Sequence, residues 1–211
     1  MKVSKSSLKL SLIVLIVYAI ILTGRNFFNY LSSFDLMQIY LAYIDRILLT
    51  ITEIYLLYFL NVFLKQEAKF SKAAIVIYGL LIAYFCILCI NLLEIFYEEY
   101  NIPEISTIAI YVFIAVLQIT LTIILYNFPS NNKYKFYISL FAHSKLLVFV
   151  ISIGAPLLLA MTNIYGNFRF INNLIPVLPC IALSLLYIFA IKNLDQEHLN
   201  EEGKEVLDYN Y

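Results

Sequence analysis

Six long stretches of this 211-residue chain are almost entirely apolar, and no other feature constrains the fold as strongly. A membrane span needs about 20 apolar residues to cross about 30 Å of hydrocarbon, and these stretches lack the polar face of a soluble helix. They cover residues 10–23, 36–64, 73–96, 105–128, 136–161 and 170–191. The pattern predicts an all-α, multi-pass membrane protein with a bundle of six transmembrane helices.

Composition excludes the main alternatives. Hydrophobic residues make up 63% of the chain and charged residues 13%, against about 45–50% and 25% in soluble domains. A soluble domain of this size cannot bury so much apolar surface, and a disordered chain needs low hydrophobicity and high charge. Basic and acidic residues balance at 14 each, without the basic stripe of a nucleic-acid-binding protein.

The chain is predicted to form one domain. Polar turn segments at residues 101–103, 129–132 and 163–167 separate spans, and no linker indicates a second domain. The transmembrane domain is expected over residues 1–194, followed by an acidic tail over residues 195–211. The start of the fifth span stays open: it begins either at residue 136 or, after an interfacial helix, at residue 146.

Lysine and arginine residues predict the orientation, because cytoplasmic loops carry an excess of them. Eleven fall on one predicted side and only Arg25 and Arg169 on the other, with Arg46 inside a hydrophobic region. Both termini are therefore expected in the cytoplasm. We expect the cell (plasma) membrane as the location, and the abundance of Ile, Asn, Lys and Tyr suggests an AT-rich, bacterial genome.

Glu53 is the strongest candidate for a functional residue. An ionisable group in hydrocarbon costs about 2.5–3.5 kcal/mol or more, so its presence needs a reason. Within the apolar run 47–64, Glu53 lies about 9 Å from one end and about 16 Å from the other. We expect its carboxyl group to face the bundle interior with a polar partner, either Lys145 at a matching depth or His143, Gln118, Thr50 or a tyrosine.

Two further groups join this predicted substrate- or ion-binding site. Arg46 lies two helical turns before Glu53 on the same face, next to Asp45; the alternative is a charge pair at the membrane interface. The chain also has prolines within the predicted fifth and sixth spans, which are expected hinges because proline kinks a helix: Pro156, Pro176 and Pro179. Kinked helices frame binding sites in transporters, but kinks without function also occur.

Other motifs indicate packing rather than chemistry. Cys86 and Cys89 lie near the middle of a span and are expected to be buried apolar residues. Gly79 and Ala83 form a small-xxx-small pattern that suits close helix packing. No metal-binding or catalytic motif and no Walker A sequence is present, so no metal or cofactor is expected.

Three functional hypotheses follow. The first is a transport-related subunit, a permease or substrate-binding membrane component with a polar site around Glu53. Its partners would be the lipid bilayer and an ATPase or another membrane subunit, because the chain encodes no ATPase. The second is a non-transporting interaction protein, such as a sensor, immunity or assembly factor. The third, an intramembrane enzyme, has the least support, because catalytic motifs are missing.

Overall fold

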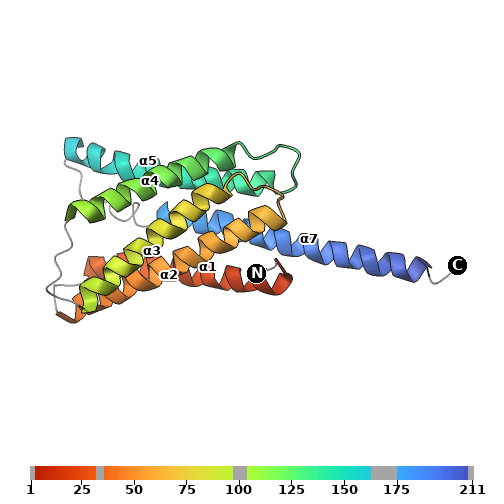
Figure 1. Ribbon diagram of the computed structural model, residues 1–211, viewed down its shortest axis with the longest axis horizontal. Helices are drawn as coiled ribbons and strands as arrows, with labels where there is room; N and C mark the ends of the chain where they lie inside the picture. Colours follow the sequence, from red (N-terminus) through yellow and green to blue (C-terminus); the bar gives the residue numbers. More distant parts are fainter. Residues whose placement is uncertain (1–2, 32–35, 97–103, 163–174, 209–211) are drawn as a thin grey trace.

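The structure is a computed structural model that describes the backbone of residues 3–31, 36–96, 104–162 and 175–208. Side chains are described for residues 3–24, 44–94, 107–151 and 175–196. Within these ranges, six long helices and one short 3-10 helix follow one another, and Figure 1 shows how the long helices are arranged. They are α1 (Lys5–Leu31), α2 (Leu36–Gln66), α3 (Ala74–Phe96), α4 (Glu104–Tyr126), α5 (Lys135–Thr162), η1 (Ile175–Val177) and α7 (Leu178–Asp208).

The predicted all-helical fold is confirmed: the described residues contain helices and no strand. Among the described residues, five helices are long and apolar enough to cross a membrane, which indicates a multi-pass membrane protein. Their membrane-capable segments are Lys5–Gly24, Ile44–Gln66, Ala74–Glu94, Thr107–Tyr126 and Ile175–Gln196. The helix α5 begins at Lys135, which agrees with the earlier of its two predicted starts. Its side chains are described only to residue 151, and the six-span count stays a prediction.

The six long helices form a closed ring. Each helix from α1 to α5 packs against the next one in sequence, α5 packs against α7, and α7 returns to α1 (Figure 1). Short connections make consecutive helices antiparallel neighbours. The ring therefore follows from the order of the helices along the chain, and it encloses a centre to which most helices contribute side chains.

One end of the ring gathers the beginning of α1, the α2–α3 loop and the α4–α5 loop. The backbone N–H of Val3 donates to Gln66 Oε1 at 2.8 Å, and Asn132 Nδ2 donates to the carbonyl of Ala68 at 2.9 Å. These bonds satisfy polar groups where the helices end. We call this the lysine-rich end, after Lys5, Lys65, Lys69, Lys72, Lys133 and Lys135.

A cluster of four aromatic side chains fills the ring on the side of the lysine-rich end. The aromatic cluster consists of Phe59, Phe63, Tyr134 and Tyr187, all almost completely buried. Phe63 lies edge-on to Tyr134 at 5.1 Å between ring centroids, and Phe59 lies edge-on to Tyr187 at 5.3 Å. Such edge-to-face contacts are favourable for aromatic pairs. The cluster closes the centre of the bundle toward this end.

The contact between α3 and α4 is unusually close at Gly79. A Cβ atom on this glycine would lie 3.1 Å from Leu117 Cδ1, which is tighter than ordinary van der Waals contact. Ala83, one turn further along α3, is buried as well. The predicted close packing at this small-xxx-small pattern is confirmed.

The aromatic cluster yields a test of the fold. Phe63→Ala should lower the free energy of unfolding by about 3–5 kcal/mol, because it leaves a cavity between two tyrosine rings. The matched variant Phe85→Ala removes the same atoms from a ring that is 59% exposed on the outside of α3, and it should cost much less. Unfolding of the purified protein in detergent measures both, and equal losses would contradict the closed ring.

Candidate functional site

Glu53 is held by a hydrogen-bonded chain that crosses three helices. Tyr84 Oη of α3 donates to Glu53 Oε1 of α2 at 2.8 Å. In turn, Gln118 Nε2 of α4 donates to Tyr84 Oη at 3.3 Å. Buried polar groups need such partners, since an unpaired one in a low-dielectric interior is costly. The prediction of an inward-facing Glu53 with a polar partner is thus confirmed, and that partner is a tyrosine.

A small central cavity lies beside this chain. Its volume is about 50 Å³, and Glu53, Gln118 and Lys145 line it together with Tyr18 and Cys180. The other lining residues are apolar: Leu15, Leu56, Leu57, Leu60, Leu121, Phe141, Pro179 and Leu183. A volume of this size holds a few water molecules or one small polar group of a ligand. Three residues predicted for the site therefore meet in one place.

The depth of these residues explains why they meet. Counted from the ends of their helices at the lysine-rich end, Glu53, Tyr84, Gln118 and Lys145 lie 13, 10, 8 and 10 residues deep. At 1.5 Å per residue these positions are about 12 to 20 Å into the bundle. Groups at similar depth on neighbouring helices of a ring can share one central space.

The direct pair predicted between Glu53 and Lys145 is not formed. Both side chains are described, but they do not come within the 4.0 Å of an ion pair. Lys145 Nζ instead lies 5.9 Å from the ring centroid of Phe141, over its face. A cation over an aromatic ring is attracted electrostatically, but more weakly than by a carboxylate at contact distance. The carboxyl and the ammonium groups thus line the same cavity without direct contact.

His143 lies outside the central cavity. It is exposed, its Nδ1 lies 2.7 Å from the carbonyl oxygen of Ser139, and its ring lies 5.1 Å from that of Tyr126. It lines an outer groove of about 560 Å³ between α5 and α7. Two residues along a helix turn the side chain by about 200°, so His143 and Lys145 face opposite ways. The prediction that places His143 near Glu53 is wrong.

Asp45 and Arg46 do not line the central cavity either. They lie two turns along α2 from Glu53, where Arg46 is exposed and Asp45 is half-buried. The carbonyl of Arg46 accepts a hydrogen bond from Thr50 Oγ1 at 2.7 Å, so this predicted partner of Glu53 bonds to its own helix instead. Whether the two charged residues bind a ligand stays a prediction.

The prolines differ in their positions. Pro176 lies in η1 and Pro179 in the first turn of α7, where proline fits because the first N–H groups of a helix lack partners anyway. Pro156 lies within α5, which is continuous from Lys135 to Thr162, and its side chain is outside the described residues. The predicted beginning of the sixth span, at residues 170–174, lies outside them too. The hinge role of the three prolines stays a prediction.

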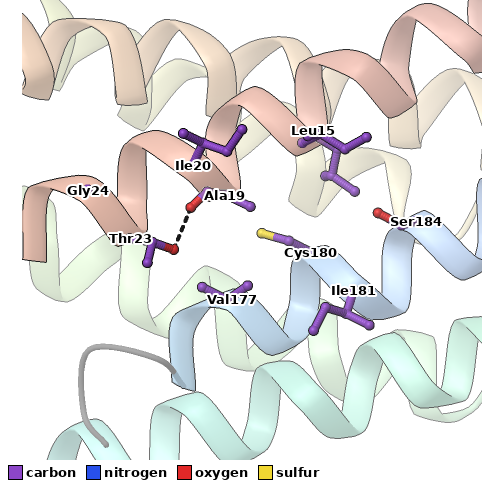
Figure 2. Close-up of a pocket in the computed structure, with 10 residues that line it drawn as sticks. Leu15, Ala19, Ile20, Thr23, Gly24, Val177, Cys180, Ile181 and Ser184 are labelled. Atoms are coloured by element: carbon purple, nitrogen blue, oxygen red, sulfur yellow. Dashed lines mark hydrogen bonds between the residues drawn. The ribbon is translucent and has the colours of Figure 1, made fainter. Parts of the chain in front are cut away.

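A second, larger hollow opens beside the central cavity. It lies between residues 15–24 of α1 and 177–184 of α7 and measures about 600 Å³ (Figure 2). We call it the lateral groove. Its wall is almost entirely apolar, and the hydroxyl of Thr23 is used within α1, donating to the carbonyl of Ala19 at 2.7 Å.

Sequence reasoning missed Tyr84 and Cys180. Tyr84 is one of 18 tyrosines. Its depth in the bundle, which is similar to that of Glu53, is the only sequence signal that could have identified it as the partner. Cys180 lines both the central cavity and the lateral groove.

Cys86 and Cys89, predicted to be buried, are exposed on α3, so that prediction is wrong. Among the described residues, no group of three or more His, Cys, Asp or Glu side chains is placed to hold a metal ion.

A double-mutant cycle tests the chain through Tyr84. Glu53→Leu and Tyr84→Phe should show a coupling of about 0.6 and at most about 1.7 kcal/mol in the free energy of unfolding, the range of hydrogen bonds between membrane helices. The control cycle pairs Glu53→Leu with Tyr111→Phe, because the ring of Tyr111 is exposed on α4. Its coupling should be near zero, and equal coupling in both cycles would contradict the assignment.

No protein-family model matches this chain. No curated protein and no solved structure matches it either. The chemistry of the central cavity is therefore the basis for assigning a function.

Proposed function

We propose that this chain is a transport-related subunit of a membrane, either a permease or a substrate-binding membrane component. The observation that carries the proposal is the central cavity, where a carboxyl, an amide and an ammonium group from α2, α4 and α5 meet. Ionisable residues that face an interior cavity in a membrane protein mark the paths of substrates and ions. A small polar solute or head group fits such a site.

The separation of Glu53 and Lys145 supports a binding role over a structural one. Two opposite charges that only stabilised the bundle would be expected in direct contact, because a buried pair needs excellent geometry to offset desolvation. Here the two groups line a space without an ion pair between them. Each therefore keeps the capacity to bind a third group.

The aromatic cluster supports one-sided access. It fills the bundle between the central cavity and the lysine-rich end, so a ligand reaches the cavity from elsewhere. Passage through the bundle requires these rings to move apart. Because the sequence has no Walker A motif, active transport requires a partner ATPase or an ion gradient.

The topology is part of the proposal. Six crossings with both termini in the cytoplasm of a bacterial cell place the lysine-rich end inside, as the excess of lysine requires. The closed ring of consecutive helices and the gathering of the basic loops at one end support this arrangement.

Reporter fusions test the orientation. Alkaline phosphatase fused after Tyr211 should stay inactive and a fluorescent protein fused there should fluoresce, because the first folds only outside the cytoplasm and the second inside. Phosphatase inserted after Gly166, in a predicted outer loop, is the control and should be active. An active phosphatase after Tyr211 would contradict the proposed orientation.

Flux through proteoliposomes tests the function. With a panel of amino acids, organic acids, fatty acids and polyamines, one class should move in the wild type. Glu53→Gln should reduce that flux about tenfold or more, because charge-assisted hydrogen bonds contribute about 1.5–3 kcal/mol. The matched control Glu67→Gln changes the same group just after α2, outside the cavity, and should leave the flux unchanged.

The result separates three possibilities. A loss of flux in Glu53→Gln with normal expression supports transport. Equal loss of expression and flux makes Glu53 structural. If no solute moves, transport is contradicted in favour of an interaction protein. One observation favours that alternative: α7 extends beyond the bundle (Figure 1). Its membrane-capable segment ends at Gln196, but the helix continues to Asp208.

A further inference from the structure

The lateral groove and the central cavity share one wall. Only Leu15 of α1 and Cys180 of α7 belong to the linings of both. Figure 2 shows the two side chains in the space between the two helices. Both are buried, but both are small or flexible enough to move without a change in the backbone. These two side chains form the wall that the groove shares with the central cavity.

The groove itself opens to the side of the bundle. Among the residues that line it, Ile16, Ile20 and Ile181 are half exposed or more. Apart from the adjacent residues and backbone of α1 itself, no described atom lies within 4 Å of the position that a Cβ on Gly24 would take. In a membrane, this side faces the acyl chains of lipids. The groove is thus an open apolar hollow that reaches the wall of the polar chamber.

One carboxyl and one ammonium group line the chamber, and they differ in their partners. The carboxyl group of Glu53 accepts a hydrogen bond from Tyr84. Within the described residues, the ammonium group of Lys145 makes no hydrogen bond or ion pair, and it lies over the ring of Phe141. An ammonium group in this setting binds a carboxylate through charge-assisted hydrogen bonds.

The two volumes limit the ligand. The groove, at about 600 Å³, lies within the range of about 300–1,000 Å³ that is typical of ligand pockets. The chamber, at about 50 Å³, accepts a group the size of a few water molecules. A sugar or phosphocholine head is too large for it, whereas a carboxylate fits.

We propose that this site takes a fatty acid, with its chain in the lateral groove and its carboxylate bound by Lys145 beyond Leu15 and Cys180. The inference rests on the proposed function and names its substrate class. The ligand enters sideways from the membrane, which agrees with the closure of the bundle by the aromatic cluster. Cys180 lies on the path, so its thiol group reports occupancy.

Alkylation of Cys180 tests the proposal. In the full chain with Cys86→Ser and Cys89→Ser, N-ethylmaleimide labels the remaining thiol, and mass spectrometry follows the rate. Oleate at about ten times its Kd should slow labelling about tenfold, since protection follows 1 + [L]/Kd. Oleyl alcohol, with the same chain and no charge, should protect much less at the same concentration.

Variants of Lys145 identify the head-group contact. Lys145→Met should remove the advantage of oleate over oleyl alcohol, and Lys145→Arg should retain it, because arginine keeps the charge. The control Lys72→Met, on an exposed lysine at the lysine-rich end, should behave as the parent. Retention of the thermal unfolding transition in each variant shows that the bundle is intact.

Each outcome decides the inference. Equal protection by oleate and oleyl alcohol, or a preference for oleate that survives Lys145→Met, overturns the carboxylate contact. No protection by either ligand overturns the lateral entrance. Protection by oleate without flux in proteoliposomes supports this binding site and contradicts transport, whereas Glu53-dependent flux of another solute without protection contradicts only the fatty acid.

Discussion

The contact between the first helix and the last one is the constraint on which the site depends. Consecutive antiparallel helices could spread into an open layer, but α7 packs against α1 and closes the ring. The ion pair between Lys5 and Asp195, at 2.6 Å, joins these helices at half-exposed positions, where such pairs contribute about 0–1 kcal/mol. Closure therefore depends on packing of buried side chains, among them Leu8, Leu15 and Leu186.

The closed ring of helices leaves a central space that only side chains can fill. Toward the lysine-rich end, large aromatic rings occupy it. Further along, leucine side chains fill most of it and leave the small polar cavity. In this low-dielectric setting, the bond from Tyr84 to Glu53 is stronger than it would be in water, and an unpaired group would be more costly. The same enclosure thus strengthens the hydrogen bonds of paired polar groups and raises the free-energy cost of unpaired ones.

The helices and the depth of the polar residues were predictable from the sequence, but the direction of each side chain was not. Depth follows from the constant rise per residue, so Glu53, Gln118 and Lys145 were expected at one level. Rotation about the helix axis follows from an apolar face, and these helices are apolar all round. His143 was therefore placed on the wrong side, and Tyr84 could not be distinguished from the other tyrosines.

Because glycine has no side chain, Gly79 has a consequence for the central cavity. Leu117, which lies against this glycine at 3.1 Å from where a Cβ would be, is the neighbour of Gln118 in α4. The bond from Gln118 to Tyr84, at 3.3 Å, is already longer than the range of about 2.7–3.2 Å that is usual for N–H···O bonds in proteins. One added methyl group would require the Leu117 side chain to give way by a few tenths of an ångström, one residue from the amide that bonds Tyr84. A residue that touches none of the polar groups thus bears on the packing beside the chain through Tyr84.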